Sequence, residues 1–337
     1  MKRWERNAGR DSVVRLSFCL LLFLAPQPTV GQEPTFRSQS NVVIVPALVR
    51  DVTGHVIYGL HATDFVIEDD GVGQAVQLDD SAEAEPLSVV VAIQTGRRAW
   101  REFGRVQGLS SMLAPILDQT RTQIAVLEFD SQLNLAQDFT DDAGQIATCL
   151  HHLEPGDRGA AILDAVQYSV RLLDKTSEGT QKVLLLISET RDHGSHFAKI
   201  DDVVALIGNS NTTVYTLAFS PTISNILDTE RGNNRDEMNS TVDLIALFAH
   251  ARAAMKSNTP KAIASQTGGE YELFESRQRF ETRMVDFTNH LHNRYLLSFE
   301  PKNLKPGLHQ IRVRLKQPGA ATILARSSYW VAAPNQQ

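Results

Sequence analysis

Two adjacent arginines follow a predicted buried strand, at the place where open α/β sheets usually bind their ligands. Residues 88–93 are almost all apolar and β-branched, which is typical of a strand covered on both faces. The strand runs into Gln94, Thr95, Gly96, Arg97 and Arg98. Ligands of such sheets lie at the carboxyl ends of the strands. Because guanidinium groups form charge-assisted hydrogen bonds with carboxylates, Arg97 and Arg98 could bind an acidic group.

A second group of side chains that could bind a metal or catalyse a reaction lies in the segment "ETRDHGSH", residues 189–196. It places His193 and His196 three residues apart, beside Glu189 and Asp192. Imidazole and carboxylate groups are zinc ligands, so one interpretation is a metal-dependent, hydrolase-like enzyme that uses this loop. The commoner interpretation is a polar surface loop after a strand. The sequence contains no Gly-x-Ser-x-Gly, phosphate-loop or Cys-x-x-Cys pattern, so no other catalytic motif competes with it.

The N-terminus has the pattern of a secretory signal peptide. Five basic residues precede the ten-residue apolar run "LSFCLLLFLA", which is too short to span a bilayer. Small and polar residues follow, so we expect a signal peptide over residues 1–31 with cleavage after Gly31. The expected location is therefore the periplasm or the extracellular medium, with no stable membrane span after cleavage.

Charge and cysteine content restrict the partners further. The chain has 33 basic and 39 acidic residues, a net charge of −6, and loss of the basic leader would make it more acidic. This balance argues against nucleic acid as a partner. Of the two cysteines, Cys19 lies in the expected leader, so Cys149 would be left without a disulfide partner.

The middle of the chain, residues 87–293, alternates strands with helices. Strands are predicted at residues 88–93, 123–129, 182–188, 213–219 and 268–274. Helices are predicted at residues 99–117, 161–175, 197–208, 242–266 and 276–295. This alternation predicts right-handed crossovers and a mostly parallel sheet with helices on both faces. The polar, Asn-rich stretch at residues 220–241 is expected to be an exposed mobile loop.

The sequences on both sides of this region predict β structure. Residues 36–80 alternate short β runs with turn signals, which predicts a small β-domain, and residues 81–86 read as a linker. Residues 294–331 form a C-terminal β segment with turn signals between its strands. A piece of about 40 residues buries too little apolar area to be stable alone, so the two flanks should pack together or onto the α/β unit.

The order of these segments resembles the von Willebrand factor type A-related proteins abundant in Acidobacteria and other soil bacteria. The two most specific pieces are "GLHATDFVIEDDG" at residues 59–71 and "SQTGGEYELFESRQRFETRMVDFTNHLHNRYLLSFEP" at residues 265–301. The resemblance covers about residues 36–330. It implies a doubly wound type A domain, flanked by β segments, that binds another protein.

The resemblance also implies a Mg²⁺ site, and this sequence departs from it. Type A domains place Asp-x-Ser-x-Ser after the first strand, with a distant Thr and a distant Asp. Laid on that pattern, the corresponding residues here are Gln94, Gly96, Arg98, Ala160 and Glu189. Mg²⁺ requires oxygen ligands in an octahedron, so we expect no Mg²⁺ and no other cofactor at this degenerate site.

Three functions follow as expectations. The first is a non-enzymatic, adhesion-type module that binds a protein partner through the carboxyl edge of the sheet, without metal. Its candidate contact residues are the degenerate-site positions Gln94, Gly96, Arg97, Arg98, Ala160 and Glu189, although a decayed site with no role is the competing interpretation. The second is the hydrolase-like enzyme that uses residues 189–196, and the third is a purely structural envelope component.

Overall fold

The computed structural model describes residues 42–79, 85–100, 104, 106, 108–118, 121–219, 244–317 and 319–333. All of them belong to one unit, Ser40–Gln337. The expected signal peptide and the expected mobile loop at residues 220–241 lie outside the described residues. In the ranges given above, no helix combines the length and the apolarity needed to cross a bilayer.

Strands dominate both ends of the described chain, and strands alternate with helices in the middle. The strands are β1 Val43–Arg50, β2 Phe65–Asp69, β3 Val72–Gln74, β4 Gln77–Asp79, β5 Leu87–Gln94, β6 Thr122–Phe129, β7 Leu133–Thr140, β8 Gln181–Glu189, β9 Thr213–Phe219, β10 Tyr271–Phe274, β11 Tyr295–Phe299, β12 Gly307–Leu315, β13 Thr322–Ala325 and β14 Ser328–Val331. The helices are the 3₁₀ turn η1 Ala62–Asp64 and α1 Arg97–Trp100, α2 Leu109–Leu117, α3 Ala143–His151, α4 Ile162–Leu173, α5 Ile200–Asn209, α6 Leu244–Ser257, α7 Thr259–Thr267 and α8 Arg277–His292.

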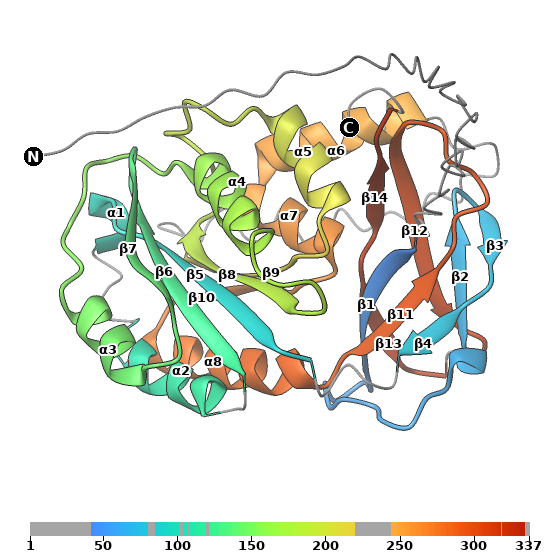
Figure 1. The fold of residues 1–337 in the computed structure, drawn as a ribbon, viewed down its shortest axis with the longest axis horizontal. Helices are drawn as coiled ribbons and strands as arrows, with labels where there is room; N and C mark the ends of the chain where they lie inside the picture. The colour runs from blue at the N-terminus through green and yellow to red at the C-terminus, as the bar shows by residue number, and fades with distance from the viewer. Residues whose placement is uncertain are drawn as a thin grey trace, which may run out of the picture. The chain divides into compact units, whose positions relative to one another are not determined.

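A six-stranded sheet forms the centre of the α/β unit (Figure 1). Its strand order is β10-β9-β8-β5-β6-β7. All neighbours pair in parallel except β7, which runs antiparallel to β6 at one edge. β5 lies between β6 and β8, and every one of its residues is buried. The mostly parallel sheet predicted from the alternating pattern is therefore confirmed.

Helices cover both faces of this sheet (Figure 1). Val89 and Val91 of β5 face a core that includes residues of α2, α3 and α8. Val90 and Ala92 face a second core, which includes residues of α4, α5 and α7. Successive strand residues point to opposite faces, so a continuous apolar run supplies both cores at once.

Two of the predicted helices are broken in the structure. The helix predicted at residues 99–117 is wrong as a single element, because α1 ends at Trp100 and α2 begins after Gly108, whose φ is 88°. That left-handed conformation cannot continue a right-handed helix. The helix predicted at residues 242–266 divides into α6 and α7 at Asn258. The Asn258 side chain accepts a hydrogen bond from the backbone N–H of Lys261 and caps α7.

The flanking β segments pack together, as expected from their size. One four-stranded sheet has the order β13-β1-β11-β4, and another has the order β14-β12-β2-β3. Each sheet combines strands from both ends of the described chain, so the small β-domain predicted over residues 36–80 is completed by strands after residue 294. Figure 1 shows these blue and red strands side by side. Their inward residues, such as Ile67 and Phe299, form a third hydrophobic core.

One buried arginine links these strands to the α/β unit. The guanidinium of Arg326 donates hydrogen bonds to the backbone carbonyls of Ile44 in β1, Ile207 and Gly208 in the last turn of α5, and Ser328. Burial lowers the pKa of Arg326 to about 10, so the side chain stays charged at neutral pH. A cation at the end of a helix also interacts favourably with the helix dipole.

Candidate functional site

The last residues of β5 and β8 form the centre of the candidate site. Gln94 ends β5 and Glu189 ends the neighbouring parallel strand β8, and their exposed fractions are 1% and 4%. Gln94 Nε2 donates to Glu189 Oε1 at 2.8 Å, and the backbone N–H of Glu189 donates to Gln94 Oε1 at 2.9 Å. The oxygen and the nitrogen of the Gln94 side-chain amide therefore both form hydrogen bonds with the same residue, Glu189. This pair of hydrogen bonds between neighbouring strand ends fixes the orientation of both side chains.

His193 completes this group from the loop after β8. Its Nε2 lies 2.6 Å from the same Glu189 Oε1 that accepts from Gln94. The His193 side chain is 36% exposed, so the group reaches the surface through its imidazole. We call these three residues the Gln94–Glu189–His193 cluster. Sequence reasoning placed His193 in a possible zinc loop and missed its contact with Glu189; the signal available was the four-residue spacing beyond the strand end.

Backbone packing leaves no room for larger side chains at Gly96. An added Cβ there would lie 2.5 Å from the carbonyl oxygen of Gly159, and the backbone N–H of Arg97 donates to the carbonyl of Asp157 at 2.5 Å. Ala160 is fully buried, and its carbonyl accepts from the backbone N–H of His193 at 3.1 Å. The loop after β5, the loop between α3 and α4, and the loop after β8 are therefore held together mainly by backbone contacts.

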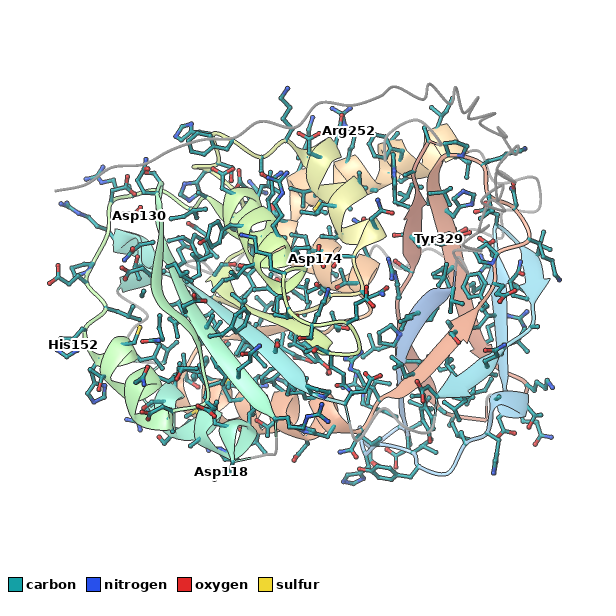
Figure 2. The ribbon with its side chains drawn as sticks, in the orientation of Figure 1. Asp118, Asp130, His152, Asp174, Arg252 and Tyr329 are labelled. Atoms are coloured by element: carbon teal, nitrogen blue, oxygen red, sulfur yellow. The ribbon has the colours of Figure 1, made fainter. Side chains whose placement is uncertain are left out.

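Asp157 organises the loop before α4. Its carboxylate accepts from the Ser131 hydroxyl, from the Ser131 backbone N–H at 3.2 Å and from the Gly159 backbone N–H at 2.7 Å. The hydrogen bond from Ser131, with those from the backbone, lowers the pKa of the Asp157 carboxyl below its ordinary value. Asp130, labelled in Figure 2, accepts the backbone N–H of Asp157 at 2.7 Å. The loop 155–160 was expected at this edge of the sheet, but the role of Asp157 in holding it was not; the turn-forming "GDRG" was the available signal.

The two arginines begin the short helix α1 at the edge of this group. Arg97 is exposed, so its guanidinium is available to solvent. Arg98 is the next residue of α1, and its side chain falls outside the described part of the structure. The structure thus places Gln94, Gly96, Arg97, Ala160 and Glu189 around one edge of the sheet. It brings Gln94 and Glu189 into direct contact.

Glu189 contacts His193, but Asp192 of this loop and the neighbouring Asp164 of α4 bind backbone N–H groups and a hydroxyl rather than a histidine ring. Asp192 accepts from the backbone N–H of Leu163 in the first turn of α4 at 3.0 Å and from the Ser195 hydroxyl at 2.5 Å. Asp164 accepts the backbone N–H groups of His196 and Ala198. Among the described residues, the group of His, Cys, Asp and Glu whose ligand atoms converge lies elsewhere, at Asp69, Asp70 and His309. This arrangement does not support the zinc interpretation of the loop.

Gly96→Ser tests how tightly this edge is packed, because it adds a side chain at Gly96. It also introduces the hydroxyl that the resemblance to type A domains leads one to expect at this position. We expect the substitution to lower the free energy of unfolding by about 1–3 kcal/mol, since the new Cβ meets the Gly159 carbonyl and the backbone must move. Urea unfolding measures the change. Gly104→Ser is the matched control, because among the described residues no atom beyond its chain neighbours lies within 4 Å of a Cβ added there. Equal stability of the two variants would contradict the close contact.

Residues 100–193 match the family model of the von Willebrand factor type A domain. The matched segment runs from the end of α1 to the loop after β8 and begins just beyond Arg98. No curated protein matches the sequence.

Several solved structures resemble the chain at low identity. The conserved hypothetical protein BatB from Bacteroides thetaiotaomicron shares 12% identity at a TM-score of 0.38, over 60% of this chain and 99% of that one. The vWF domain of the type V pili tip protein Mfa5 from Porphyromonas gingivalis shares 10% at a TM-score of 0.41, over 61% and 95%. Proximal thread matrix protein 1 from the mussel byssus, with a zinc-occupied MIDAS motif, shares 14% at 0.45, over 66% and 49%.

The mostly parallel sheet has helices on both faces, so this region is a doubly wound α/β fold. In such folds, the carboxyl ends of the strands are the usual place for a ligand. Within this α/β region, the segment 100–193 is similar to the von Willebrand factor type A domain.

Proposed function

We propose that the protein is an exported, non-enzymatic binding module of the acidobacterial von Willebrand factor type A-related type, with a degenerate metal-ion-dependent adhesion site. Its contact surface is the carboxyl edge of the six-stranded sheet, formed by residues 94–98, 155–160 and 189–195. The observation that carries the proposal is the Gln94–Glu189–His193 cluster. Two of its members, Gln94 and Glu189, correspond to positions where the type A pattern supplies ligands to Mg²⁺, and His193 adjoins them.

The chemistry of this edge favours binding without metal. Gln94 offers only a neutral amide, whose oxygen and nitrogen both contact Glu189, and Ala160 and Gly96 offer no side-chain oxygen. Glu189 Oε1 already accepts from Gln94 and lies against the His193 imidazole. A hard cation that needs six oxygen ligands finds a poor donor set here.

Arginine can take over the role of the cation in binding an acidic partner. The metal of a type A domain presents positive charge to a carboxylate from the partner. Arg97 is exposed beside the cluster and presents positive charge with several N–H donors at the same edge. A guanidinium binds a carboxylate through two parallel hydrogen bonds, so the same class of partner group is recognised without the ion.

The double variant Arg97→Ala/Arg98→Ala tests this proposal. We expect it to weaken partner binding by about 2 kcal/mol, roughly 30-fold, the size expected for lost charge-assisted hydrogen bonds. The full exported chain is immobilised, envelope proteins of the source cells are captured, and the dissociation constant of the captured partner is measured with each variant. EDTA should leave the wild-type constant unchanged.

The matched control is Arg312→Ala/Arg314→Ala, which removes the same charge from β12, where both arginines pair with Glu68. This control should bind like the wild type. Binding that is indifferent to the Arg97/Arg98 variant would favour a decayed site. Mg²⁺ binding measured by calorimetry and abolished by Glu189→Ala would refute the proposal of binding without metal. Metal-dependent hydrolysis that is lost in His193→Gln would favour the hydrolase-like enzyme instead.

A further inference from the structure

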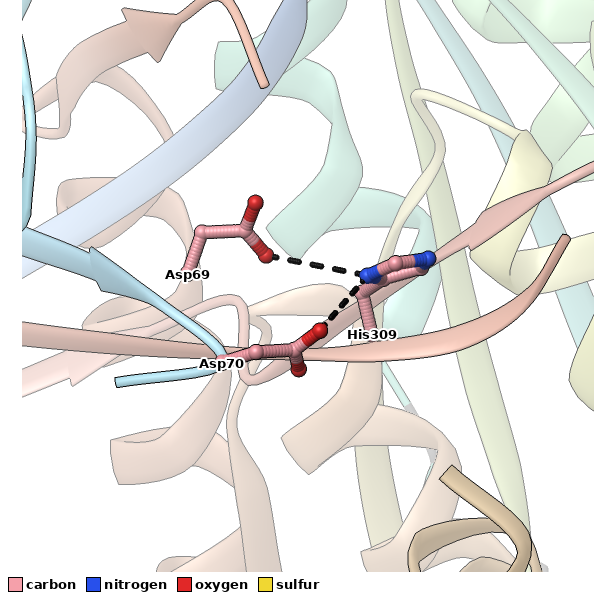
Figure 3. Close-up of side chains that lie close together, drawn as sticks. All are labelled: Asp69, Asp70 and His309. Atoms are coloured by element: carbon pink, nitrogen blue, oxygen red, sulfur yellow. Dashed lines mark hydrogen bonds and ion pairs between the residues drawn. The ribbon is translucent and has the colours of Figure 1, made fainter. Parts of the chain in front are cut away.

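Three potential metal ligands meet far from the carboxyl edge described above, within the β strands (Figure 3). Asp69 ends β2, Asp70 follows it in the tight turn to β3, and His309 lies on β12. β2 and β12 are antiparallel neighbours, with Asp69 opposite Ile311. The pairing therefore brings together residues that are separated by about 240 positions along the chain.

The ligand atoms of the three side chains point toward one another. His309 Nδ1 lies 2.8 Å from Asp70 Oδ2 and 3.9 Å from Asp69 Oδ1. One atom from each residue lies within 4.8 Å of the other two. Figure 3 shows both carboxylates directed at the same ring nitrogen. His309 is fully buried, while the Asp70 side chain retains 14% exposure, which gives an ion a route from solvent.

The other polar atom of each side chain is held by an outer partner. His309 Nε2 lies 2.6 Å from the carbonyl of Lys305, which can only accept, so Nε2 carries a proton and Nδ1 faces the carboxylates. The Tyr329 hydroxyl donates to Asp69 Oδ2 at 3.0 Å, and the Gln310 backbone N–H donates to Asp70 Oδ1 at 2.9 Å. Metal sites in proteins commonly orient their ligands in this way.

Within this group of three residues, one buried oxygen has no hydrogen bond, although leaving it unpaired is costly. Asp69 is 2% exposed, and its Oδ1 has no hydrogen-bond partner among the described residues. Leaving a buried acceptor unsatisfied costs about 1–3 kcal/mol, and more for a charged group. This oxygen is directed at His309 Nδ1, beside the Asp70 carboxylate, where a bound cation would satisfy it.

We propose that Asp69, Asp70 and His309 form a binding site for a divalent transition metal, with Zn²⁺ as the best match. One imidazole nitrogen and two carboxylate oxygens suit zinc, whereas Mg²⁺ and Ca²⁺ favour all-oxygen sites. Without metal, His309 Nδ1 and Asp70 Oδ2 share one proton in their hydrogen bond, and Zn²⁺ binding releases that proton to solvent. Water supplies the remaining ligand. The ion joins the turn after β2 to β12 and so ties the two ends of the described chain together.

Calorimetric titration tests the site directly. The full exported chain is treated with EDTA, returned to metal-free buffer and titrated with ZnSO₄ alone. We expect one Zn²⁺ per chain and a higher melting temperature with zinc. Asp69→Asn, Asp70→Asn and His309→Gln should each weaken zinc binding by at least about 100-fold, and Tyr329→Phe, which removes an outer partner of Asp69, by about 10–100-fold.

Two controls keep the result interpretable. His193→Gln and Glu189→Ala alter the sheet edge and should bind zinc like the wild type. Circular dichroism checks folding, and if His309→Gln does not fold, the isosteric Asp69→Asn and Asp70→Asn decide the question. The proposal is overturned if the wild type shows no saturable zinc binding, or if binding survives both asparagine variants. Zinc binding lost in His193→Gln would also overturn it and would locate the ion at the sheet edge.

Discussion

Replacing Glu270 with alanine is expected to lower the free energy of unfolding by about 3–5 kcal/mol, because it leaves the buried cation of Arg294 without its counter-charge. Glu270 lies between α7 and β10 and is buried. Its carboxylate lies 3.1 Å from the Arg294 guanidinium and 3.0 Å from His290 Nδ1, and Arg50 approaches to 3.5 Å. The Arg294 side chain is only 8% exposed, so water cannot replace the lost carboxylate. Urea unfolding at neutral pH measures the effect.

The same group predicts a pH dependence. Burial by itself raises the pKa of Glu270, but the hydrogen bond from His290 and the charge of Arg294 outweigh it and bring the pKa below its ordinary value of 4.5. Because the folded-state pKa is lowered, the carboxylate stabilises the fold fully at pH values above its ordinary pKa of 4.5. This stabilisation is lost as the pH falls through the folded-state pKa.

Glu270→Gln separates charge from shape. Its destabilisation relative to the wild type should be largest near neutral pH and should shrink below about pH 4.5. Arg283→Gln is the matched control, because it removes a charge from a partly exposed group that pairs with Glu272 and Asp286, and it should cost about 1 kcal/mol or less. A Glu270→Gln penalty that stays constant from neutral to acid pH would refute the assigned role of the charge.

Gly269→Ala is expected to destabilise the fold by about 3 kcal/mol or more, through a backbone collision. An added Cβ would lie 1.9 Å from the carbonyl oxygen of Val214. Val214 is fixed in β9: it pairs with Leu184 of β8, and its N–H donates to the Thr267 hydroxyl at 3.1 Å. Val214 cannot move away without opening the sheet, and Gly269 cannot move away without displacing the end of α7.

Thermal and urea unfolding of Gly269→Ala compare it with Gly73→Ala, where no atom lies within 4 Å of the added Cβ. The control should stay within about 0.5 kcal/mol of the wild type. A Gly269→Ala chain as stable as this control would show that the approach of Gly269 to β9 is looser than the structure describes.

Strong local patterns explain which elements the sequence could predict. Four of the five predicted sheet strands lie within about two residues of β5, β6, β8 and β9, since their long apolar runs allow no other placement. β7 and α3 escaped prediction. β7 is an edge strand whose residues are mostly half-buried or exposed, so it shows no apolar run, and α3 buries only Ile146. Asp142, which accepts from the Gly144 N–H and caps α3, was the one local signal.

By itself, the sequence determined the order of the segments and the parallel sheet. Those features depend on local periodicity and on residue type. Only the tertiary structure decided the contacts: Gln94 and Glu189 are 95 positions apart, and His309 and Asp70 are 239 apart. Strand pairing sets such contacts through its register, and a register shift of one residue would turn each side chain to the opposite face. The sequence pattern alone leaves that register open.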